Sequence, residues 1–245
     1  MLPRTADIIV IGAGIGGASV AAECAVSADV LLLERESSAG YHATGRSAAY
    51  YAPAYGNAVV RAMTRASEAF YRHPPADSFA PELLRPRDCI YVGRADQAAT
   101  MQSLQDEVPA LEEQPVAALA ERLGILRPGA VASALRDADG GDLDVDRILQ
   151  GYLRRLKNRG GRLHTGEEIL SLARARGLWQ VETGQGTWSA PVVINAAGAW
   201  ADTIAGLAGL EPLGIGPLRR TAVLVDPPPG VDVSDWPLLV DADEA

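Results

Sequence analysis

The stretch that decides the fold is "DIIVIGAGIGGASVAAECAVSADVLLLE", residues 7–34. It starts with an apolar run, Asp7 to Ile11, passes through the turn GAGIGG into an Ala-rich run, Ala18 to about Ser27, and ends in a second apolar run, Val30 to Glu34. Continuous apolar runs are typical of buried parallel strands, because helices cover both faces of such a sheet. The stretch therefore predicts a strand, turn, helix and strand that open a parallel sheet.

The glycines of this turn have the spacing GxGxxG, the fingerprint of an adenine dinucleotide site. Gly12 permits the tight turn, Gly14 lets the backbone approach a pyrophosphate at the helix N-terminus, and Gly17 lets the helix pack on the strand. Glu34, at the end of the second strand, is placed to accept hydrogen bonds from both ribose hydroxyls. NAD and FAD share the fingerprint, and a glycine turn used only for packing also has it.

A second run of small residues lies in "VVINAAGAWAD", residues 192–202. An apolar strand there leads into Asn195, Ala196, Ala197 and Gly198, where missing side chains would let backbone amides lie against a flat ligand. A plain turn before a C-terminal helix is the alternative. The first interpretation requires that this segment and the glycine turn converge in space.

The rest of the chain predicts further helices and strands. Helical spacing and end signals predict helices over residues 56–71, 95–108, 116–123, 145–158 and 201–207. Short apolar or alternating runs predict strands over residues 87–93, 162–164, 169–173, 179–183, 187–189 and 219–226. The four candidates between 162 and 189 suggest a small antiparallel insert, and residues 37–54 read as a long loop.

Composition and charge exclude several classes of protein. With 245 residues and a formal net charge of -9, the chain is expected to be soluble and globular, with no nucleic-acid partner. Cys24 and Cys89 lack CxxC spacing, and the N-terminus lacks a signal peptide, so we expect a cytoplasmic protein. Charged residues interrupt the longest apolar stretch, Ala18 to Leu33, so no membrane span is expected.

The spacing of the acidic residues, histidines and Ser47 does not fit a metal site or a catalytic nucleophile. The aspartates between residues 137 and 146 lack the glycine and closing glutamate of a calcium loop. His42, His73 and His164 have no paired ligand spacing, and Ser47 has no nucleophile elbow around it. The sequence predicts neither a metal site nor a triad.

The glycine turn, the loop "GYHATGRSAAYY" (residues 40–51) and "VVINAAGAWADTIAGLAG" (residues 192–209) together resemble the D-amino-acid-oxidase-like FAD-dependent oxidoreductases, nearest to D-arginine dehydrogenase-like members. The resemblance implies an α/β fold, with a Rossmann-like FAD-binding domain built on a parallel sheet and an antiparallel α+β substrate lobe. It implies that residues 1–85 and 142–215 form the FAD-binding domain, and residues 86–141 and 216–245 an incomplete substrate lobe. Family members usually continue beyond this length, so a C-terminal part of the family fold is expected to be absent.

The same resemblance implies the residues that hold the cofactor FAD. The ADP half would contact the fingerprint glycines, the loop after residue 43 would lie along the pyrophosphate and flavin, and a strand near Glu168 would meet the adenine edge. The implied cofactor-binding residues are Gly12, Gly14, Gly17, Glu34, Arg35, Thr44, Gly45, Arg46, Ser47, Ala48, Ile169, Ala197 and Gly198.

The implied reaction oxidises the Cα–H of a D-amino acid, basic or of broad specificity, by hydride transfer to flavin, and gives an imino acid. An electron acceptor that the sequence does not identify would reoxidise the flavin. Strand alternation puts Arg220 on one face with Ala222 and Leu224, which favours it as the partner of the substrate carboxylate. A solvated arginine pair at a strand start is the alternative.

Three further residues are implied to position the substrate. Asp88 stands where relatives have a glutamate that meets the basic end of the substrate, and a salt bridge with Arg85 or Arg87 is the other use of an acid here. Tyr55 is implied to reach the substrate. Tyr50 stands where relatives place a histidine, and it does not titrate near neutral pH as histidine does.

Three alternatives remain open. The same fold oxidises glycine, sarcosine or a 2-hydroxy acid in other members, and the glycines alone also permit an NAD-dependent dehydrogenase. The third is a non-catalytic, truncated FAD-binding fragment. If the chain is such a fragment, we expect it to bind FAD weakly or not at all.

Overall fold

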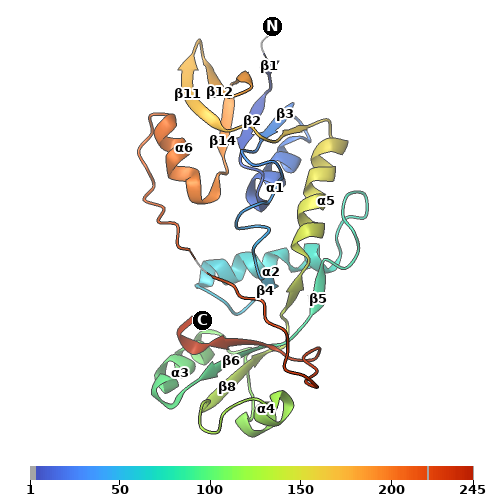
Figure 1. Ribbon diagram of the computed structural model, residues 1–245, viewed down its shortest axis with the longest axis vertical. Coiled ribbons are helices and arrows are strands. Elements are labelled where there is room, and N and C mark those ends of the chain that lie inside the picture. The colour runs from blue at the N-terminus through green and yellow to red at the C-terminus, as the bar shows by residue number, and fades with distance from the viewer. Residues whose placement is uncertain (1–3, 220, 245) are drawn as a thin grey trace. The chain divides into compact units, whose positions relative to one another are not determined.

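The computed structural model describes residues 4–219 and 221–244, which fall into two compact units (Figure 1). Unit 1 is built from the described residues of 1–48, 75–81 and 144–221, and unit 2 from those of 49–74, 82–143 and 222–245. The division differs from the domains implied by the sequence chiefly in residues 49–74, which group with unit 2. The chain thus crosses between the units several times.

Unit 1 contains a four-stranded parallel sheet with the order β10-β3-β2-β14. Its strands are β2 (Ile8–Ile11), β3 (Val30–Leu33), β10 (Arg162–His164) and β14 (Val192–Asn195). β2 lies between β3 and β14, so the glycine turn that follows β2 is adjacent to the small residues that follow β14. The predicted parallel sheet is confirmed, but β10 was wrongly assigned to an antiparallel insert. It pairs parallel with β3 instead.

Alternation along the central strands supplies a core on each side of this sheet. Helices α1 (Ile15–Cys24) and α5 (Val145–Asn158) pack on the face that carries Val10, Val30 and Leu32. Small residues of α1 such as Ala21 and Ala22 are fully buried there, which lets the helix lie close to the sheet. The opposite face carries Ile9, Ile11, Leu31 and Leu33. Both faces are therefore covered, as the continuous apolar runs predict.

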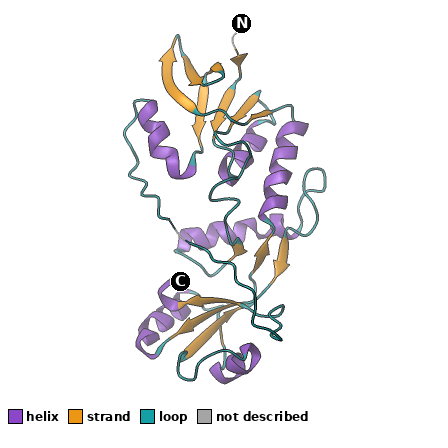
Figure 2. Cartoon of the chain, viewed as in Figure 1, coloured by secondary structure: helices purple, strands orange, loops and turns teal. Residues whose placement is uncertain are grey.

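A second, mostly antiparallel sheet covers that opposite face. Its order is β1-β13-β12-β11, with β1 (Arg4–Thr5), β11 (Ile169–Ala175), β12 (Leu178–Thr183) and β13 (Gly186–Ala190). Its buried side chains and those of α6 (Ala201–Leu207) join the core of the parallel sheet. Figure 2 shows these strands and α6 by secondary structure. The predicted antiparallel insert is thus confirmed for its last three strands.

Unit 2 is built on two small sheets. One has the order β15-β6-β8-β7, with β6 (Cys89–Gly93), β7 (Glu112–Glu113), β8 (Ser133–Asp137) and β15 (Leu238–Asp241). The other has the order β4-β9-β5, with β4 (Tyr50–Tyr51), β5 (Leu84–Pro86) and β9 (Gly141–Leu143). The helices of this unit are α2 (Ala58–Arg72), α3 (Ala98–Glu107) and α4 (Val116–Leu123). Short 3-10 turns cover Ala95–Gln97 and Ala242–Glu244 here, and Gly198–Trp200 in unit 1.

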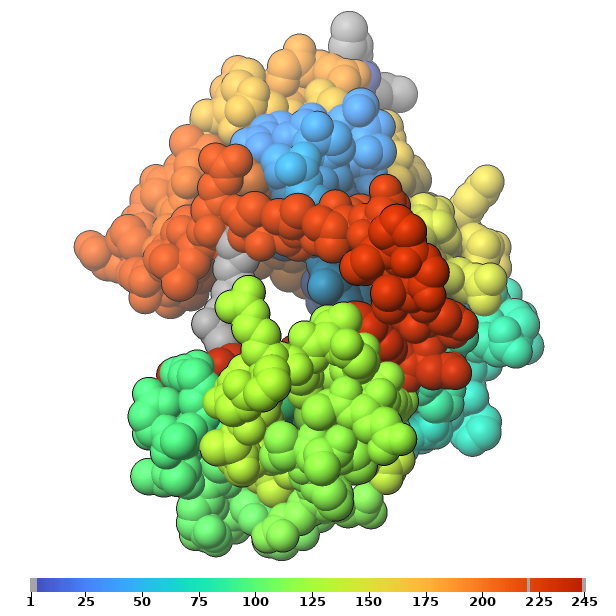
Figure 3. Space-filling view, turned by 60° about the horizontal axis from the view of Figure 1, so that its bottom comes forward, coloured from blue at the N-terminus to red at the C-terminus, as the bar shows by residue number. Residues whose placement is uncertain are grey.

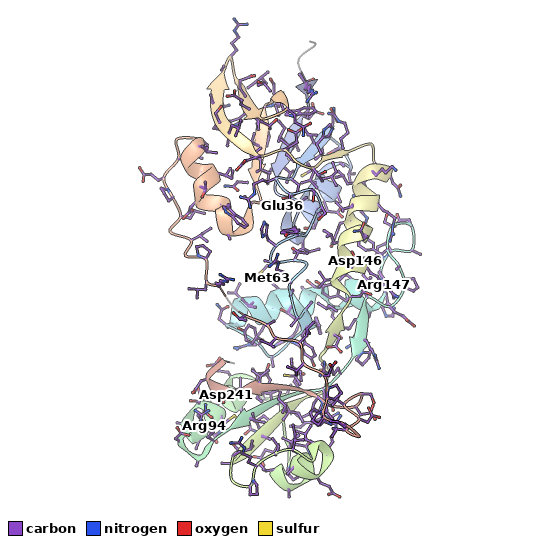
Figure 4. All side chains as sticks on the ribbon, in the orientation of Figure 1. Glu36, Met63, Arg94, Asp146, Arg147 and Asp241 are labelled. Carbon is purple, nitrogen blue, oxygen red and sulfur yellow. The ribbon has the colours of Figure 1, made fainter. Side chains whose placement is uncertain are left out.

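An ion pair fixes β15 at the edge of its sheet. Arg94 donates to Asp241 at 2.8 Å, and Gln97 donates to the other carboxylate oxygen at 2.7 Å (Figure 4). β15 pairs parallel with β6 over four residues. The segment at the end of the chain is therefore held by both backbone and side-chain bonds.

The strand predicted over residues 219–226 was wrong for the residues that the structure describes. Residues 221–226 have no regular secondary structure, and Leu224 is fully exposed. Figure 3 shows red atoms of this last part of the chain at the surface. Alternation alone does not make a strand, because a strand needs a partner for its backbone groups.

Among the described residues, no helix is long and apolar enough to cross a bilayer.

Candidate functional site

Unit 1 has a cavity of about 420 Å³ at the carboxyl ends of β2, β3 and β14. We call it the glycine-turn cavity. Carboxyl ends of parallel strands are where open α/β sheets bind ligands. Of the predicted cofactor residues, the cavity is lined by Gly12, Gly14, Glu34, Arg35, Thr44, Ile169, Ala197 and Gly198.

Gly12 and Gly17 each lack a side chain for a different structural reason. Gly12 has φ +99°, and a Cβ there would lie 2.6 Å from the carbonyl oxygen of Ala196. A Cβ at Gly17 would lie 1.7 Å from the carbonyl oxygen of Gly12, so α1 packs on the turn only because residue 17 lacks a side chain. Gly16 has open space around its Cβ position. The turn and the 196–198 segment are therefore in direct contact, as the sequence-based interpretation requires.

The N-terminus of α1 opens into this cavity. Gly14 precedes the helix and has no side chain to cap it, and no acidic residue lies in the first turn. The hydroxyl oxygen of Thr44 accepts a hydrogen bond from the backbone N–H of Ile15 at 2.9 Å. The first turn of the helix thus carries no acidic residue of its own, which leaves the positive end of its dipole available to a phosphate group beside the Thr44 hydroxyl.

Glu34 is held rigidly at the cavity wall. Its two carboxylate oxygens accept from the backbone N–H groups of Ala13 at 2.7 Å and Glu36 at 2.9 Å. A carboxylate oxygen has more than one lone-pair position, so each can also accept from a ribose hydroxyl. The bonds to the backbone hold the side chain in place for that role.

A cluster next to Glu34 was missed by sequence reasoning. The guanidinium of Arg35 lies 4.5 Å from the Trp200 ring centroid, and the His42 ring lies 4.6 Å from it. The side chains of His42 and Arg35 also form hydrogen bonds with the Glu36 carboxylate, at 2.8 Å and 2.9 Å respectively. These hydrogen bonds lower the pKa of Glu36. His42 looks isolated in the sequence because its partners come from other segments. Only its place in the 40–51 loop signals a role.

The remaining predicted loop residues do not line the cavity. Gly45 donates its N–H to the carbonyl of Gly40 at 2.7 Å and so closes the loop. The Arg46 guanidinium lies 5.2 Å from the Tyr41 ring, and Ser47 and Ala48 are exposed. The structure therefore brings together eight of the predicted cofactor residues around the cavity, and it places Gly17 beneath the turn.

These residues fit the ADP half of a dinucleotide. An extra Cβ at Gly12 or Gly17 would collide with backbone, the first turn of the helix has no acidic residue, and Glu34 is fixed beside it. Residues Ala197 and Gly198 bring backbone rather than bulk to the cavity wall. No side chain of the fingerprint blocks the approach of a pyrophosphate.

Unit 2 contains a second pocket, of about 380 Å³. Tyr50 and Tyr55, which were predicted to position the substrate, both line it. The Tyr50 hydroxyl donates to the carbonyl oxygen of Arg87, and burial raises the pKa of Tyr50. Tyr55 is 43% exposed. Asp88 is not a lining residue of this pocket.

Asp88 has two arginine partners within unit 2. Its carboxylate accepts from Arg136 at 3.0 and 3.1 Å, and Arg122 lies 3.5 Å away. The predicted alternative of a bridge to Arg85 or Arg87 was therefore wrong. Arg87 instead bonds Asp142 at 3.1 Å. The hydrogen bond from Arg136 lowers the pKa of Asp88. The other predicted substrate residue, Arg220, lies outside the described residues.

Solved structures similar to this one share its fold, among them a glycerophosphate oxidase and a glycine oxidase. L-alpha-glycerophosphate oxidase from Mycoplasma pneumoniae, with FAD bound, superposes with a TM-score of 0.74 at 13% identity, over 84% of this chain and 57% of its own. Glycine oxidase from Geobacillus kaustophilus superposes with a TM-score of 0.72 at 18% identity. That match covers 85% of this chain and 59% of the oxidase chain. At these identities the likeness shows the fold alone.

Sequence comparison gives a curated relative and a family. One subunit of the anaerobic glycerol-3-phosphate dehydrogenase of Escherichia coli (strain K12) is 27% identical over an alignment of 239 residues, and the match covers 91% of this chain and 43% of the relative. This chain thus spans less than half of that relative. The family model DAO, FAD dependent oxidoreductase, matches residues 7–245. The chain therefore belongs to the DAO family of FAD-dependent oxidoreductases, and FAD is the cofactor that its glycine-turn cavity fits.

Proposed function

We propose that this protein oxidises the Cα–H bond of a D-amino acid with FAD as the oxidant. The observation that carries the proposal is the convergence of the glycine turn, Glu34 and the 196–198 segment around one cavity. The choice of an amino acid is supported by the resemblance to D-arginine dehydrogenase-like sequences in the 40–51 loop. Tyr55, which the resemblance implies to reach the substrate, and Tyr50, which stands where relatives place a histidine, line the pocket of unit 2.

The chain's own residues hold and orient the reactants. We assign the pyrophosphate to the N-terminus of α1, the ribose hydroxyls to Glu34, and flavin contacts to the backbone of Ala197 and Gly198. FAD supplies the acceptor for the hydride that leaves Cα. The substrate amine loses a proton in the same oxidation, and water hydrolyses the imino acid to a 2-oxo acid and ammonia.

The remaining roles in the proposal belong to the substrate side. Arg220 binds the substrate carboxylate, Tyr55 reaches the substrate, and Tyr50 and Asp88 shape its surroundings.

We also propose a cytoplasmic location, in keeping with the free thiols of Cys24 and Cys89, and a separate electron acceptor for reduced flavin.

A second candidate is oxidation of a phosphorylated or free hydroxy acid or alcohol. It is favoured by the curated relative, which belongs by name to a glycerol-3-phosphate dehydrogenase. Such a substrate also loses a hydride from carbon, but from a carbon that carries a hydroxyl instead of an amine. The two candidates thus share the cofactor and differ in the substrate.

One anaerobic experiment tests both candidates. The protein is loaded with FAD and mixed with a D-amino acid mixture, glycine, sarcosine, 2-hydroxy acids or glycerol 3-phosphate, and the flavin absorbance is followed. Bleaching by D-amino acids supports the proposal. Bleaching by glycerol 3-phosphate or a hydroxy acid alone rejects it in favour of the second candidate. A protein that binds FAD but is bleached by none of these is not an enzyme of either kind.

A further inference from the structure

Glu34, the carboxylate assigned to the ribose, is held through its backbone by a turn from a distant part of the chain. Its N–H donates to the carbonyl oxygen of His164 at 2.9 Å, and its carbonyl oxygen accepts from the N–H of Glu167 at 2.8 Å. A third bond, from the N–H of Gly166, reaches the carbonyl oxygen two residues after Glu34 at 2.9 Å. We call residues 164–167 the supporting turn. Its position determines where the backbone of Glu34 lies.

The side chain of Glu167 is a buried carboxylate within this turn. It is 1% exposed, and Glu167 is also a lining residue of the glycine-turn cavity. One of its carboxylate oxygens accepts a hydrogen bond from the hydroxyl of Thr183 on β12. The carbonyl oxygen of Gly186 lies 3.1 Å from the same hydroxyl, but the carboxylate is closer and charged, so it is the stronger acceptor. The supporting turn is thus tied to β12 by a side-chain hydrogen bond.

The other carboxylate oxygen of Glu167 has no hydrogen-bond partner in the part of the chain that the structure describes. The Nδ1 atom of His164 lies 3.8 Å from it, which is longer than a hydrogen bond. A buried carboxylate oxygen without a partner lowers the stability of a protein, and an apolar side chain of similar size often stabilises the fold at least as well. A role at the cavity therefore explains a glutamate at this position better than the stability of the fold does.

We infer that Glu167 is a positioning residue for FAD: through its bond to Thr183 it fixes the supporting turn, and the turn holds Glu34 where Glu34 binds the ribose. The inference rests on the assignment of the ribose to Glu34 in the proposed function. A binding group is most effective when its neighbours fix it in the bound geometry. The effect of Glu167 should therefore be seen in the recognition of the ribose hydroxyls.

The first test compares ADP with 2′-deoxy-ADP, which lacks one ribose hydroxyl. The full chain is loaded with FAD, either nucleotide is added as a competitor, and the released FAD is followed by its fluorescence. The unchanged protein should bind ADP about tenfold more tightly than 2′-deoxy-ADP, because a hydrogen bond to a charged group is lost. We call this factor the ribose ratio.

Glu167→Met removes the bond to Thr183 and keeps a side chain of similar length. It should lower the ribose ratio to about threefold or less, and it should weaken FAD binding about tenfold. A Glu167→Met protein that keeps the full ribose ratio overturns the inference even if it binds FAD more weakly, because a general loss of structure weakens both nucleotides alike. A chain that binds neither FAD nor ADP also overturns it.

Glu182→Met is the matched control. Glu182 precedes Thr183 on β12, is exposed, and accepts a hydrogen bond from the hydroxyl of Ser171 at 2.8 Å. It is absent from the described lining of the glycine-turn cavity. The change therefore removes a carboxylate–hydroxyl bond from the same sheet without touching the supporting turn. The ribose ratio and the FAD affinity should both stay unaltered. A loss as large as that in Glu167→Met would overturn the inference.

Changes at Thr183 test the same bond from its other end. Thr183→Val removes the hydroxyl and should lower the ribose ratio as Glu167→Met does, whereas Thr183→Ser keeps the hydroxyl and should keep the ratio. The double variant Glu167→Met/Thr183→Val removes both groups together, so neither is left buried and unpaired, and it serves if a single variant does not fold. Its ribose ratio should equal that of either single variant, because both changes break one bond. An unaltered ratio in the double variant, or a lowered ratio in Thr183→Ser, overturns the inference.

Combination with Glu34→Gln separates this inference from the proposed function. If Glu167 acts only through Glu34, Glu167→Met should not lower the ribose ratio further in a Glu34→Gln background. Additive losses would show that Glu167 acts independently of Glu34 and would overturn the inference. A full ribose ratio in Glu34→Gln rejects the assignment of the ribose to Glu34, and the inference with it. If no substrate bleaches the flavin, the proposed reaction fails, but a ribose ratio that depends on Glu167 still supports the inference.

Discussion

At the scale of single residues, Glu34 is the carboxylate of the cavity lining whose role in FAD binding is most directly testable. It accepts two backbone hydrogen bonds and is placed for the ribose of FAD. Glu34→Gln keeps the shape of the side chain but removes its charge and replaces one acceptor with a donor. Because a hydrogen bond to a charged group contributes about 1.5–3 kcal/mol, we expect FAD affinity to fall about 10- to 100-fold. Titration of free FAD fluorescence measures this.

The control for that variant is Glu211→Gln, which makes the same change at an exposed position away from the cavity lining. It should leave the affinity for FAD unaltered. Equal FAD affinity in Glu34→Gln and the unchanged protein would remove Glu34 from the binding site.

Asp88 gives a prediction about pH and stability. Bonding to Arg136 lowers its pKa below the ordinary value of 3.8, so the stabilisation is fully present above about pH 4 and is lost as pH falls through the folded pKa. Asp88→Asn should therefore cost about 1 kcal/mol at pH 7, the scale of a partly exposed ion pair. Urea unfolding at several pH values should show the difference shrink below about pH 4. A constant difference down to pH 2 would contradict this.

At the scale of elements, the fit of α1 against the turn depends on residue 17. A Cβ on Gly17 would lie 1.7 Å from the Gly12 carbonyl oxygen, whereas one on Gly16 meets nothing within 4 Å. Gly17→Ala should lower the free energy of unfolding by about 2 kcal/mol or more through overpacking. Gly16→Ala should raise it by up to about 1 kcal/mol through helix propensity. Chemical denaturation of both variants measures the contrast, and equal stabilities would refute the packing argument.

Helices with strong local signals were predicted well from the sequence. α4, α5 and α6 have the predicted bounds, because periodicity, caps and a terminal glycine are all local features. The N-cap of α5 shows this, since the Asp144 carboxylate accepts from the N–H of Arg147 at 2.9 Å. The helix after the glycine turn starts three residues earlier than predicted, at Ile15, because glycines there do not prevent helix formation.

Features that depend on distant partners were predicted less well. β8 was missed because "SALRD" has little strand character of its own and forms beside β6. Residues 219–226 have the alternation of a strand but no described partner. Asp88 shows the same limit within a site, because the two arginines that bind it follow it by 34 or more positions in the chain. The places of the fingerprint glycines and Glu34 were predicted correctly, because their spacing reflects one local strand, turn and helix.

At the scale of the whole molecule, each unit has its own buried clusters. The clusters of unit 1 surround its parallel sheet, and those of unit 2 surround β6 and β8. The glycine-turn cavity is lined by residues of unit 1 alone. A ligand that binds only the folded form of unit 1 should therefore stabilise that unit selectively.

Hydrogen exchange with and without FAD tests this selectivity. At an FAD concentration about 100 times the dissociation constant, linkage predicts about 2.7 kcal/mol of stabilisation, which slows exchange through global opening of unit 1 about 100-fold. The amides of β2 and β3 should show this slowing, whereas those of β6 and β8 should exchange at their former rates. Glu34→Gln should shift the FAD concentration at which protection appears. Equal slowing in both units would show that they unfold together, and no slowing in either would mean that this chain does not bind FAD.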